Sequence, residues 1–155
     1  MSSHYKYLNR RLYDAQGATA VLSQPEELTE VLREVGSFIR AAGAEPIFVG
    51  PTPETGIDKG KCVTSALWRG VPPEACNFTT DHLPEASEAS YAALAALAPE
   101  FTVLDLREVT CPGGTCQTAI EGLPLYRDKG HFSINGSALL GNTLDPLAQL
   151  LQSGS

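Results

Sequence analysis

The sequence has no long apolar stretch. Across its 155 residues, no run approaches the about 20 apolar residues that a bilayer-spanning helix needs. The N-terminus, Met1-Ser-Ser-His-Tyr-Lys-Tyr, also lacks the apolar core of a secretory signal. We therefore expect no direct membrane insertion, and these features alone predict a protein that stays in the cytoplasm.

Clusters of basic residues are missing as well. The chain has 11 Lys and Arg against 18 Asp and Glu, for a net charge of -7. Nucleic acids and anionic membranes are bound through clustered Lys and Arg, so neither is an expected partner. A composition of 43% hydrophobic and 19% charged residues is that of an ordinary globular protein, long enough for one domain with a real core.

The cysteines lack the spacing of a zinc or redox site. No Cys-x-x-Cys occurs, and the three histidines are not at zinc-finger spacing, so we expect no metal and no cofactor. The four cysteines form two local pairs, Cys62 with Cys76 and Cys111 with Cys116. These pairs favour disulfides in an oxidising compartment, although four cysteines permit three pairings. Free structural thiols are the main alternative, followed by metal or redox chemistry.

Apolar periodicity predicts helices that alternate with buried strands. Ser23 and Glu26 form a capping box at the start of the first helix, and Gly43 follows its end. Such an alternation predicts an α/β domain with parallel strands. The expected helices are residues 24–42, 87–98 and 134–151, and the expected strands are residues 45–50 and 101–106.

Two parts of the chain are less regular. Residues 52–86 contain several Pro and Gly and are expected to form a long connection, which a Cys62–Cys76 bond would pin. Residues 1–22 are expected to be an irregular segment, in which 18–22 is a weak third strand. Trp68, the only tryptophan, is expected to fix a loop rather than to bind a substrate.

An Asp lies three residues before a His, just ahead of the last predicted helix. At this spacing, Asp128 can hold the imidazole of His131 in one tautomer while the ring acts as a general base. The alternative is a solvated pair in a turn that caps the helix beginning after Ser133.

The residues around this pair resemble a known motif. Cys111-Pro-Gly-Gly-Thr-Cys116, Gly122-Leu-Pro-Leu-Tyr126, Asp128-x-x-His131-x-Ser133 and Gly136 resemble the last motif block of SGNH hydrolases. The resemblance runs from about residue 25 to residue 150 and includes Gly50-Pro51-x-Pro53 and Cys62. It is strongest to the SGNH domain that is fused to bacterial membrane O-acyltransferases, which modify cell-surface polysaccharides.

The resemblance implies a three-layer α/β/α, flavodoxin-like fold and a periplasmic or other extracytoplasmic location, in agreement with disulfides. It implies a sugar or acyl-ester substrate and a membrane acyltransferase domain as partner. His131 would be the base and Asp128 its orienting carboxylate. The nucleophile of the family is a Ser in a Gly-Asp-Ser motif, and no such motif occurs in this sequence. Ser37, inside the first helix, is a poor substitute.

The missing nucleophile and the small number of strands have the same explanation. A doubly wound sheet has about five strands, whereas only two are clear here. We therefore expect residues 23–155 to be the C-terminal portion of an SGNH-like domain, truncated at its N-terminal side. The predicted function is that of an O-acyltransferase or esterase domain acting on O-acyl groups of cell-surface glycans, inactive without its Ser. The alternative is a non-catalytic SGNH-like remnant or binding module.

Overall fold

The computed structural model describes residues 11–13, 19–21 and 25–144. The chain divides into two compact units, which are described separately. The first unit consists of Met1–Pro51 and Glu85–Asp105, and the second consists of Thr52–Pro84 and Leu106–Ser155. No helix within the described ranges is both long and apolar enough to cross a membrane.

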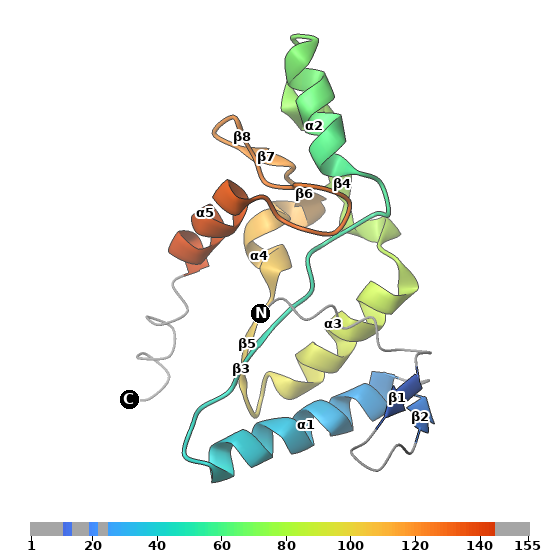
Figure 1. The fold of residues 1–155 in the computed structure, drawn as a ribbon, viewed down its shortest axis with the longest axis vertical. Coiled ribbons are helices and arrows are strands. Elements are labelled where there is room, and N and C mark those ends of the chain that lie inside the picture. The colour runs from blue at the N-terminus through green and yellow to red at the C-terminus, as the bar shows by residue number, and fades with distance from the viewer. Residues whose placement is uncertain (1–10, 14–18, 22–24, 145–155) are drawn as a thin grey trace. The chain divides into compact units, whose positions relative to one another are not determined.

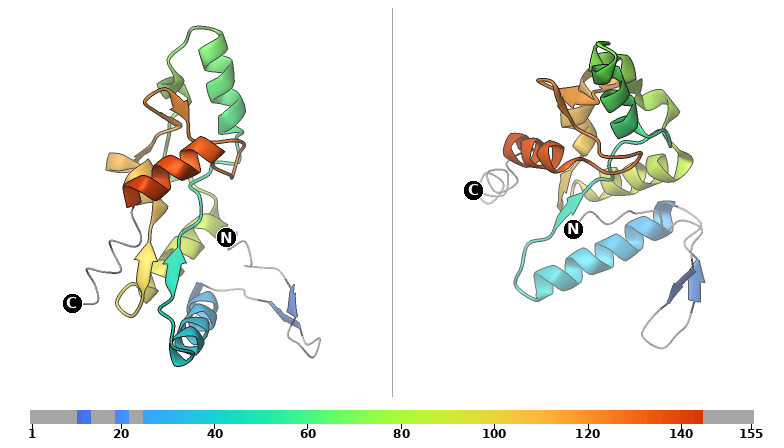
Figure 2. Two further views of the ribbon diagram at one scale, coloured as in Figure 1. Left: turned by 60° about the vertical axis from the view of Figure 1, so that its left-hand side comes forward. Right: turned by 45° about the horizontal axis from the view of Figure 1, so that its top comes forward.

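The first unit contains the predicted parallel pair of strands. Strand β3 (Ile47–Val49) pairs in parallel with β5 (Thr102–Leu104). The two arrows lie side by side and point the same way (Figure 2, left). Helices α1 (Pro25–Ala41) and α3 (Glu85–Leu97) pack on one another in the same unit (Figure 1). These bounds confirm the expected helices and strands of this part of the chain to within a few residues.

The core of the first unit is aromatic and aliphatic. Phe48 of β3, Leu94 and Leu97 of α3, and Phe101 form one buried cluster. The Phe48 and Phe101 rings meet edge to face with centroids 5.5 Å apart, a favourable arrangement for aromatic pairs. This cluster fixes the two strands against α3.

Helix α1 buries only part of its predicted apolar stripe. Leu28 is buried against Ala93 of α3. Val31, Val35 and Phe38, which the periodicity also assigns to the stripe, are exposed, and Phe38 is 76% exposed. The helix is therefore as predicted, but its apolar face is wider than the surface that covers it among the described residues.

The N-terminal segment contains strands where we expected irregular structure. Strand β1 (Arg11–Tyr13) pairs antiparallel with β2 (Thr19–Val21). The weak strand expected at residues 18–22 is thus present as β2, but its partner is β1 and not the parallel pair. Strands separated by only five residues pair antiparallel, because a parallel pairing needs a longer crossover.

In the second unit, the expected long connection contains a helix. Helix α2 spans Lys59–Trp68, and the Oδ1 atom of its N-cap Asp58 accepts the Lys61 N–H at 2.8 Å. Its inner face places Val63 and Ala66 against Cys76. The expectation of an irregular connection is wrong here, because so short an apolar face between Gly and Pro residues gives little periodic signal.

Helix α2 is tied to the segment that follows it. The Cys62–Cys76 disulfide joins α2 to the 3-10 helix η1 (Pro73–Cys76), with Cα atoms 5.9 Å apart. Lys59 is buried, donates to the Cys76 carbonyl oxygen at 3.3 Å and lies over the Phe78 ring. Burial lowers the pKa of the Lys59 ammonium. The predicted pinning of this segment by a disulfide is confirmed.

Trp68 differs from the prediction. It is the last residue of α2, and its side chain is 88% exposed, so it does not fix a loop. The reason is its position in the helix, where it follows Lys61 and Ser65 on the outer face, opposite Val63 and Ala66.

The second disulfide also forms as predicted. Cys111 and Cys116 are bonded, with Cα atoms 3.7 Å apart. The bond closes a turn at Gly113 and Gly114, whose φ angles of 63° and 81° suit glycine. Helix α4 (Leu106–Thr110) and the 3-10 helix η3 (Pro112–Gly114) lie before strand β6 (Thr115–Cys116), which pairs antiparallel with β4 (Phe78–Thr79).

The second unit contains further elements besides these. A 3-10 helix, η2, spans Thr80–His82, and β7 (Ala119–Ile120) pairs with β8 (Leu123–Pro124) as a hairpin. Helix α5 spans Ile134–Leu144 and confirms the start of the expected helix 134–151. The continuation of that helix, from residue 145 on, lies outside the described residues.

The tight contact between α1 and Phe101 predicts a stability effect. A Cβ atom at Gly36 would lie 2.6 Å from Cε1 of Phe101, a ring already held by Phe48. We expect Gly36→Ala to destabilise the protein by about 1–2 kcal/mol in urea unfolding, because overpacking outweighs the gain of about 1 kcal/mol in helix propensity. Gly141→Ala in α5, where a Cβ meets nothing within 4 Å, is the control and should be neutral or stabilising. Equal stability of the two variants would contradict this packing.

Candidate active site

The Asp128–His131 pair lies in a closed loop whose ends are fixed. Leu125 and Tyr126 are buried at the start of the loop. Tyr126 and Phe132 form an isolated antiparallel bridge, and the Arg127 N–H donates to the His131 carbonyl oxygen at 2.9 Å. The loop therefore closes on itself before α5 begins, and its geometry depends mainly on local contacts.

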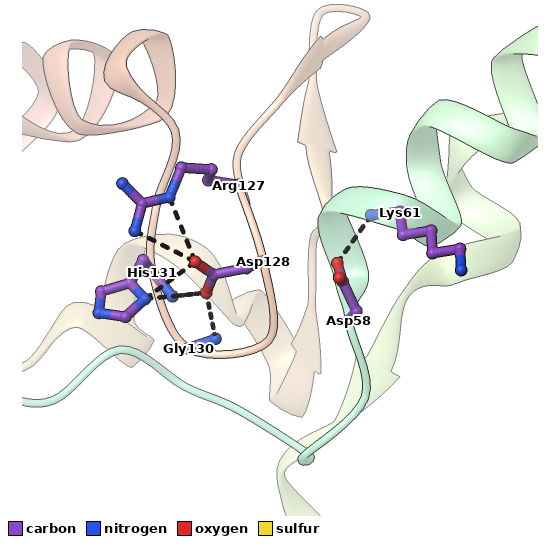
Figure 3. A network of polar contacts seen from close by, with 6 residues as sticks. All are labelled: Asp58, Lys61, Arg127, Asp128, Gly130 and His131. Atoms are coloured by element: carbon purple, nitrogen blue, oxygen red, sulfur yellow. Dashed lines mark hydrogen bonds and ion pairs between the residues drawn. The ribbon is translucent and has the colours of Figure 1, made fainter.

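The Asp128 carboxylate is the centre of this loop. Its Oδ1 atom accepts the backbone N–H groups of Gly130 at 3.0 Å and His131 at 2.9 Å. The Nδ1 atom of His131 lies 2.9 Å from Oδ1 and 3.0 Å from Oδ2. Arg127 donates from Nε and Nη2 to Oδ2 at 3.2 and 3.1 Å. Figure 3 shows these groups gathered around the carboxylate. The predicted contact between Asp128 and one ring nitrogen is present.

These contacts set the charge of the carboxylate. The Gly130 N–H holds the pKa of Asp128 well below its usual value, and the hydrogen bonds from His131 and Arg127 lower it further. Asp128 is therefore ionised at neutral pH and acts only as an acceptor. A neutral imidazole next to it carries its proton on Nδ1, which leaves the lone pair on Nε2. His131 is 48% exposed, so the ring is accessible from solvent.

A second carboxylate lies against the loop. Glu54 is only 6% exposed, and a Cβ atom at Gly130 would come within 2.6 Å of its Oε2 atom. Gly130 therefore lets the loop approach Glu54. No local pattern in the sequence marks Glu54 as a site residue. Its only signal is its place directly after the Pro51-x-Pro53 segment, which belongs to the family motif.

Two further glycines bring helices against the loop backbone. A Cβ atom at Gly60, in the first turn of α2, would overlap the carbonyl oxygen of Arg127. A Cβ atom at Gly136, in the first turn of α5, would overlap the carbonyl oxygen of Leu125. Ser133 caps α5, since its Oγ accepts the Gly136 N–H at 2.9 Å and donates to the Pro124 carbonyl oxygen at 2.7 Å. The motif residues Ser133 and Gly136 thus position the loop.

An open pocket lies beside the loop. It has a volume of about 440 Å³ and is bordered by one face of α2 and by Arg127. Among the described residues, no group of three or more His, Cys, Asp and Glu side chains is arranged to hold a metal ion. The lining residues are Asp58, Gly60, Lys61, Thr64, Ser65, Trp68 and Arg127.

Two expectations about this site stay predictions. Because sites in parallel α/β folds lie at the carboxyl edge of the sheet, the sequence predicts His131 at that edge. This stays a prediction, since strands β3 and β5 belong to the first unit and the loop to the second. The catalytic roles of His131 and Asp128 also remain to be tested. Ser37 is an exposed residue of α1, within a helix as expected.

Comparison with known proteins assigns the family. The family model described as "SGNH domain (fused to AT3 domains)" matches residues 1–146, and the chain belongs to this family. Such domains are of the acyl-transfer and esterase type. No curated protein matches the chain.

A solved structure supports the fold. The chain is similar to the periplasmic domain of the lipopolysaccharide acetyltransferase of Salmonella ser. Paratyphi A, with a TM-score of 0.58 and 19% sequence identity. The match covers 85% of this chain and 52% of that chain, so this chain spans about half the length of that relative. The predicted SGNH-like α/β fold is confirmed.

The contact between Gly130 and Glu54 can be tested by a double-mutant cycle. We expect Gly130→Ala to destabilise the protein by about 1–3 kcal/mol, because the new methyl group meets a buried carboxylate. In a Glu54→Ala background, the same substitution should have a smaller effect, since the obstacle is gone. Urea unfolding of the parent, the two single variants and the double variant measures the effect of Gly130→Ala in each background. Additive effects would show that the two positions do not touch.

The ionised state of Asp128 predicts a pH dependence of stability. Its folded pKa is below the unfolded value of about 3.9, so its contribution is complete above that value and is lost as pH falls toward the folded pKa. Asp128→Asn should therefore be less stable than the parent at pH 6, with a difference that shrinks below about pH 4. Urea midpoints measured from pH 6 to pH 2 provide the test. A constant difference over this range would contradict the assigned hydrogen bonds.

Proposed function

We propose that this chain supplies the general base of an acyl-transfer site, with His131 as the base and Asp128 as the residue that orients it. The observation that carries the proposal is the position of Nδ1 within 2.9 and 3.0 Å of the two carboxylate oxygens. Because an ionised carboxylate only accepts hydrogen bonds, it favours the tautomer in which Nε2 has the lone pair. That nitrogen is the one a Ser hydroxyl would approach.

The reaction follows from this arrangement. Nε2 of His131 takes the proton of a Ser hydroxyl while the Ser Oγ bonds to the carbonyl carbon of the acyl donor. The bond to the leaving oxygen then breaks, and that oxygen takes the proton from His131. The resulting acyl-serine is attacked by a sugar hydroxyl, whose proton passes to His131 and then to the released Ser. Water in place of the sugar gives hydrolysis.

The Ser must come from elsewhere, because no Gly-Asp-Ser motif occurs in the 155 residues. We propose that it is supplied by sequence outside this chain and that a membrane acyltransferase domain delivers the acyl group. The fusion of this family to AT3 domains supports such a partner. The two disulfides support a location outside the cytoplasmic membrane.

The proposed substrates are O-acyl groups of cell-surface glycans. This assignment rests on the family and on the similarity to an acetyltransferase domain whose name refers to lipopolysaccharide. A non-catalytic SGNH-like binding module is the second candidate, and the absence of a Gly-Asp-Ser motif favours it.

Activity measurements separate these candidates. With the 155-residue chain, acetylated methyl glycosides should release acetate no faster than in buffer alone. A longer protein that joins the chain to a Gly-Asp-Ser segment should release acetate faster than buffer. In the longer protein, His131→Ala should abolish turnover, and Asp128→Asn should reduce kcat by about 10³–10⁴-fold because it favours the wrong tautomer. Glu34→Gln, on the exposed surface of α1 in the first unit, is a control that should keep activity.

Nuclear magnetic resonance tests the tautomer without a nucleophile. The ¹⁵N shifts of neutral His131 should show the proton on Nδ1 in the parent chain and a shift toward the Nε2–H form in Asp128→Asn. A parent ring protonated mainly on Nε2 would contradict the proposed base. A correct tautomer together with an inactive longer protein would favour the binding module.

A further inference from the structure

The pocket beside the loop is lined by a single face of α2. The pocket is bordered by the residues at positions i, i+3, i+4 and i+7 of the helix, which are Lys61, Thr64, Ser65 and Trp68. The opposite face, with Val63 and Ala66, is buried. The outer face is therefore held in place by the core and by the Cys62–Cys76 bond, while its side chains remain accessible.

Trp68 is the unusual member of this face. An indole is among the most costly side chains to leave in water, yet that of Trp68 is 88% exposed. Its flat ring borders the open pocket along α2. A rigid, exposed aromatic face beside polar groups suits a ligand that has both an apolar surface and many hydroxyl groups.

The polar groups of the pocket match such a ligand. Thr64 donates its hydroxyl proton to the Gly60 carbonyl oxygen at 2.9 Å, so its oxygen can still accept. The Ser65 hydroxyl oxygen accepts from Arg69 at 2.8 Å, so its proton can still be donated. Within the described ranges, the Lys61 ammonium forms no ion pair, and Figure 3 shows its side chain directed away from Arg127. The pocket thus offers both donors and acceptors.

The pocket is directly joined to the Asp128–His131 loop. Arg127 borders the pocket and also donates to the Asp128 carboxylate. The first turn of α2 lies on the Arg127 backbone at Gly60, where no side chain would fit. A ligand held on α2 would therefore lie against Arg127, the residue that precedes Asp128 and donates to its carboxylate.

We propose that this pocket is a glycan subsite in which Trp68 stacks on a pyranose ring and Lys61, Thr64 and Ser65 bond to its hydroxyl groups. The C–H bonds on one face of a pyranose meet the electron-rich face of the indole, and the ring hydroxyls point outward to the polar side chains. This inference rests on the proposed function in assigning the sugar as acyl acceptor. It adds the residues that select and hold the acceptor.

The test uses Trp68 itself, because it is the only tryptophan of the chain. Soluble tetrasaccharides of glucose, galactose, mannose, rhamnose and N-acetylglucosamine are titrated into the 155-residue protein. At least one should shift the emission of Trp68 to shorter wavelength and saturate at millimolar concentration, since the sugar replaces water on the indole. If none changes the emission up to 20 mM, the subsite is overturned.

Saturation-transfer resonance with matched variants locates the binding. Trp68→Ala should abolish the transfer to the sugar, Trp68→Tyr should retain it more weakly, and Lys61→Gln should weaken binding at least threefold. Phe38→Ala removes another exposed aromatic side chain, in α1, and should leave sugar binding unchanged. Equal losses in Trp68→Ala and Phe38→Ala would overturn the site. The site would also be overturned if the emission of Trp68 changed with protein concentration and with none of the sugars.

Activity in the longer protein separates this inference from the proposed function. Trp68→Ala should raise KM for the sugar acceptor at least tenfold with little change in kcat. Activity that is unaffected by Trp68→Ala would overturn the subsite alone. Sugar binding at Trp68 in a longer protein without activity would overturn the proposed function alone.

Discussion

The Asp128 carboxylate determines the conformation of the loop that carries His131. The carboxylate accepts hydrogen bonds from two backbone N–H groups, from one ring nitrogen and from one guanidinium. Its two oxygens therefore fix both the direction of the chain and the orientation of the imidazole. All of these bonds join residues no more than three positions apart in the sequence. The pair is therefore preorganised by local geometry, which is what a general base requires.

Glycine residues allow the neighbouring segments to pack closely against this loop. Gly130 admits Glu54, Gly60 admits the Arg127 backbone, and Gly136 admits Leu125. A side chain at Gly60 or Gly136 would push the loop backbone away from the helix, and one at Gly130 would displace the Glu54 carboxylate. The glycines near the pair thus serve close packing rather than turn formation, since none of the three has a positive φ angle.

Local patterns in the sequence predicted much of this structure. Helix α1, helix α3 and the parallel pair β3 and β5 were visible because apolar residues repeat over many positions. The Asp128–His131 contact was visible because both residues lie in one short motif. Helix α2 was missed, since its buried face consists of little more than Val63 and Ala66.

What the sequence could not predict depends on contacts between distant residues. Glu54 lies more than seventy residues before Gly130, and no local pattern links them. The exposure of Trp68 follows from the orientation of α2, which is fixed by a core and a disulfide that only the folded chain shows. The prediction of Trp68 as a loop residue failed for that reason.

The Cys62–Cys76 bond has a consequence for when the site can assemble. The bond closes a short loop, and such a crosslink lowers the entropy of the unfolded chain. This raises the free energy of unfolding by about 3 kcal/mol. Helix α2 has a small buried face, so much of its order depends on that bond. In a reducing environment the helix would lose this restraint, and with it the surface beside Arg127. Maturation of the site is thereby coupled to oxidation of the chain.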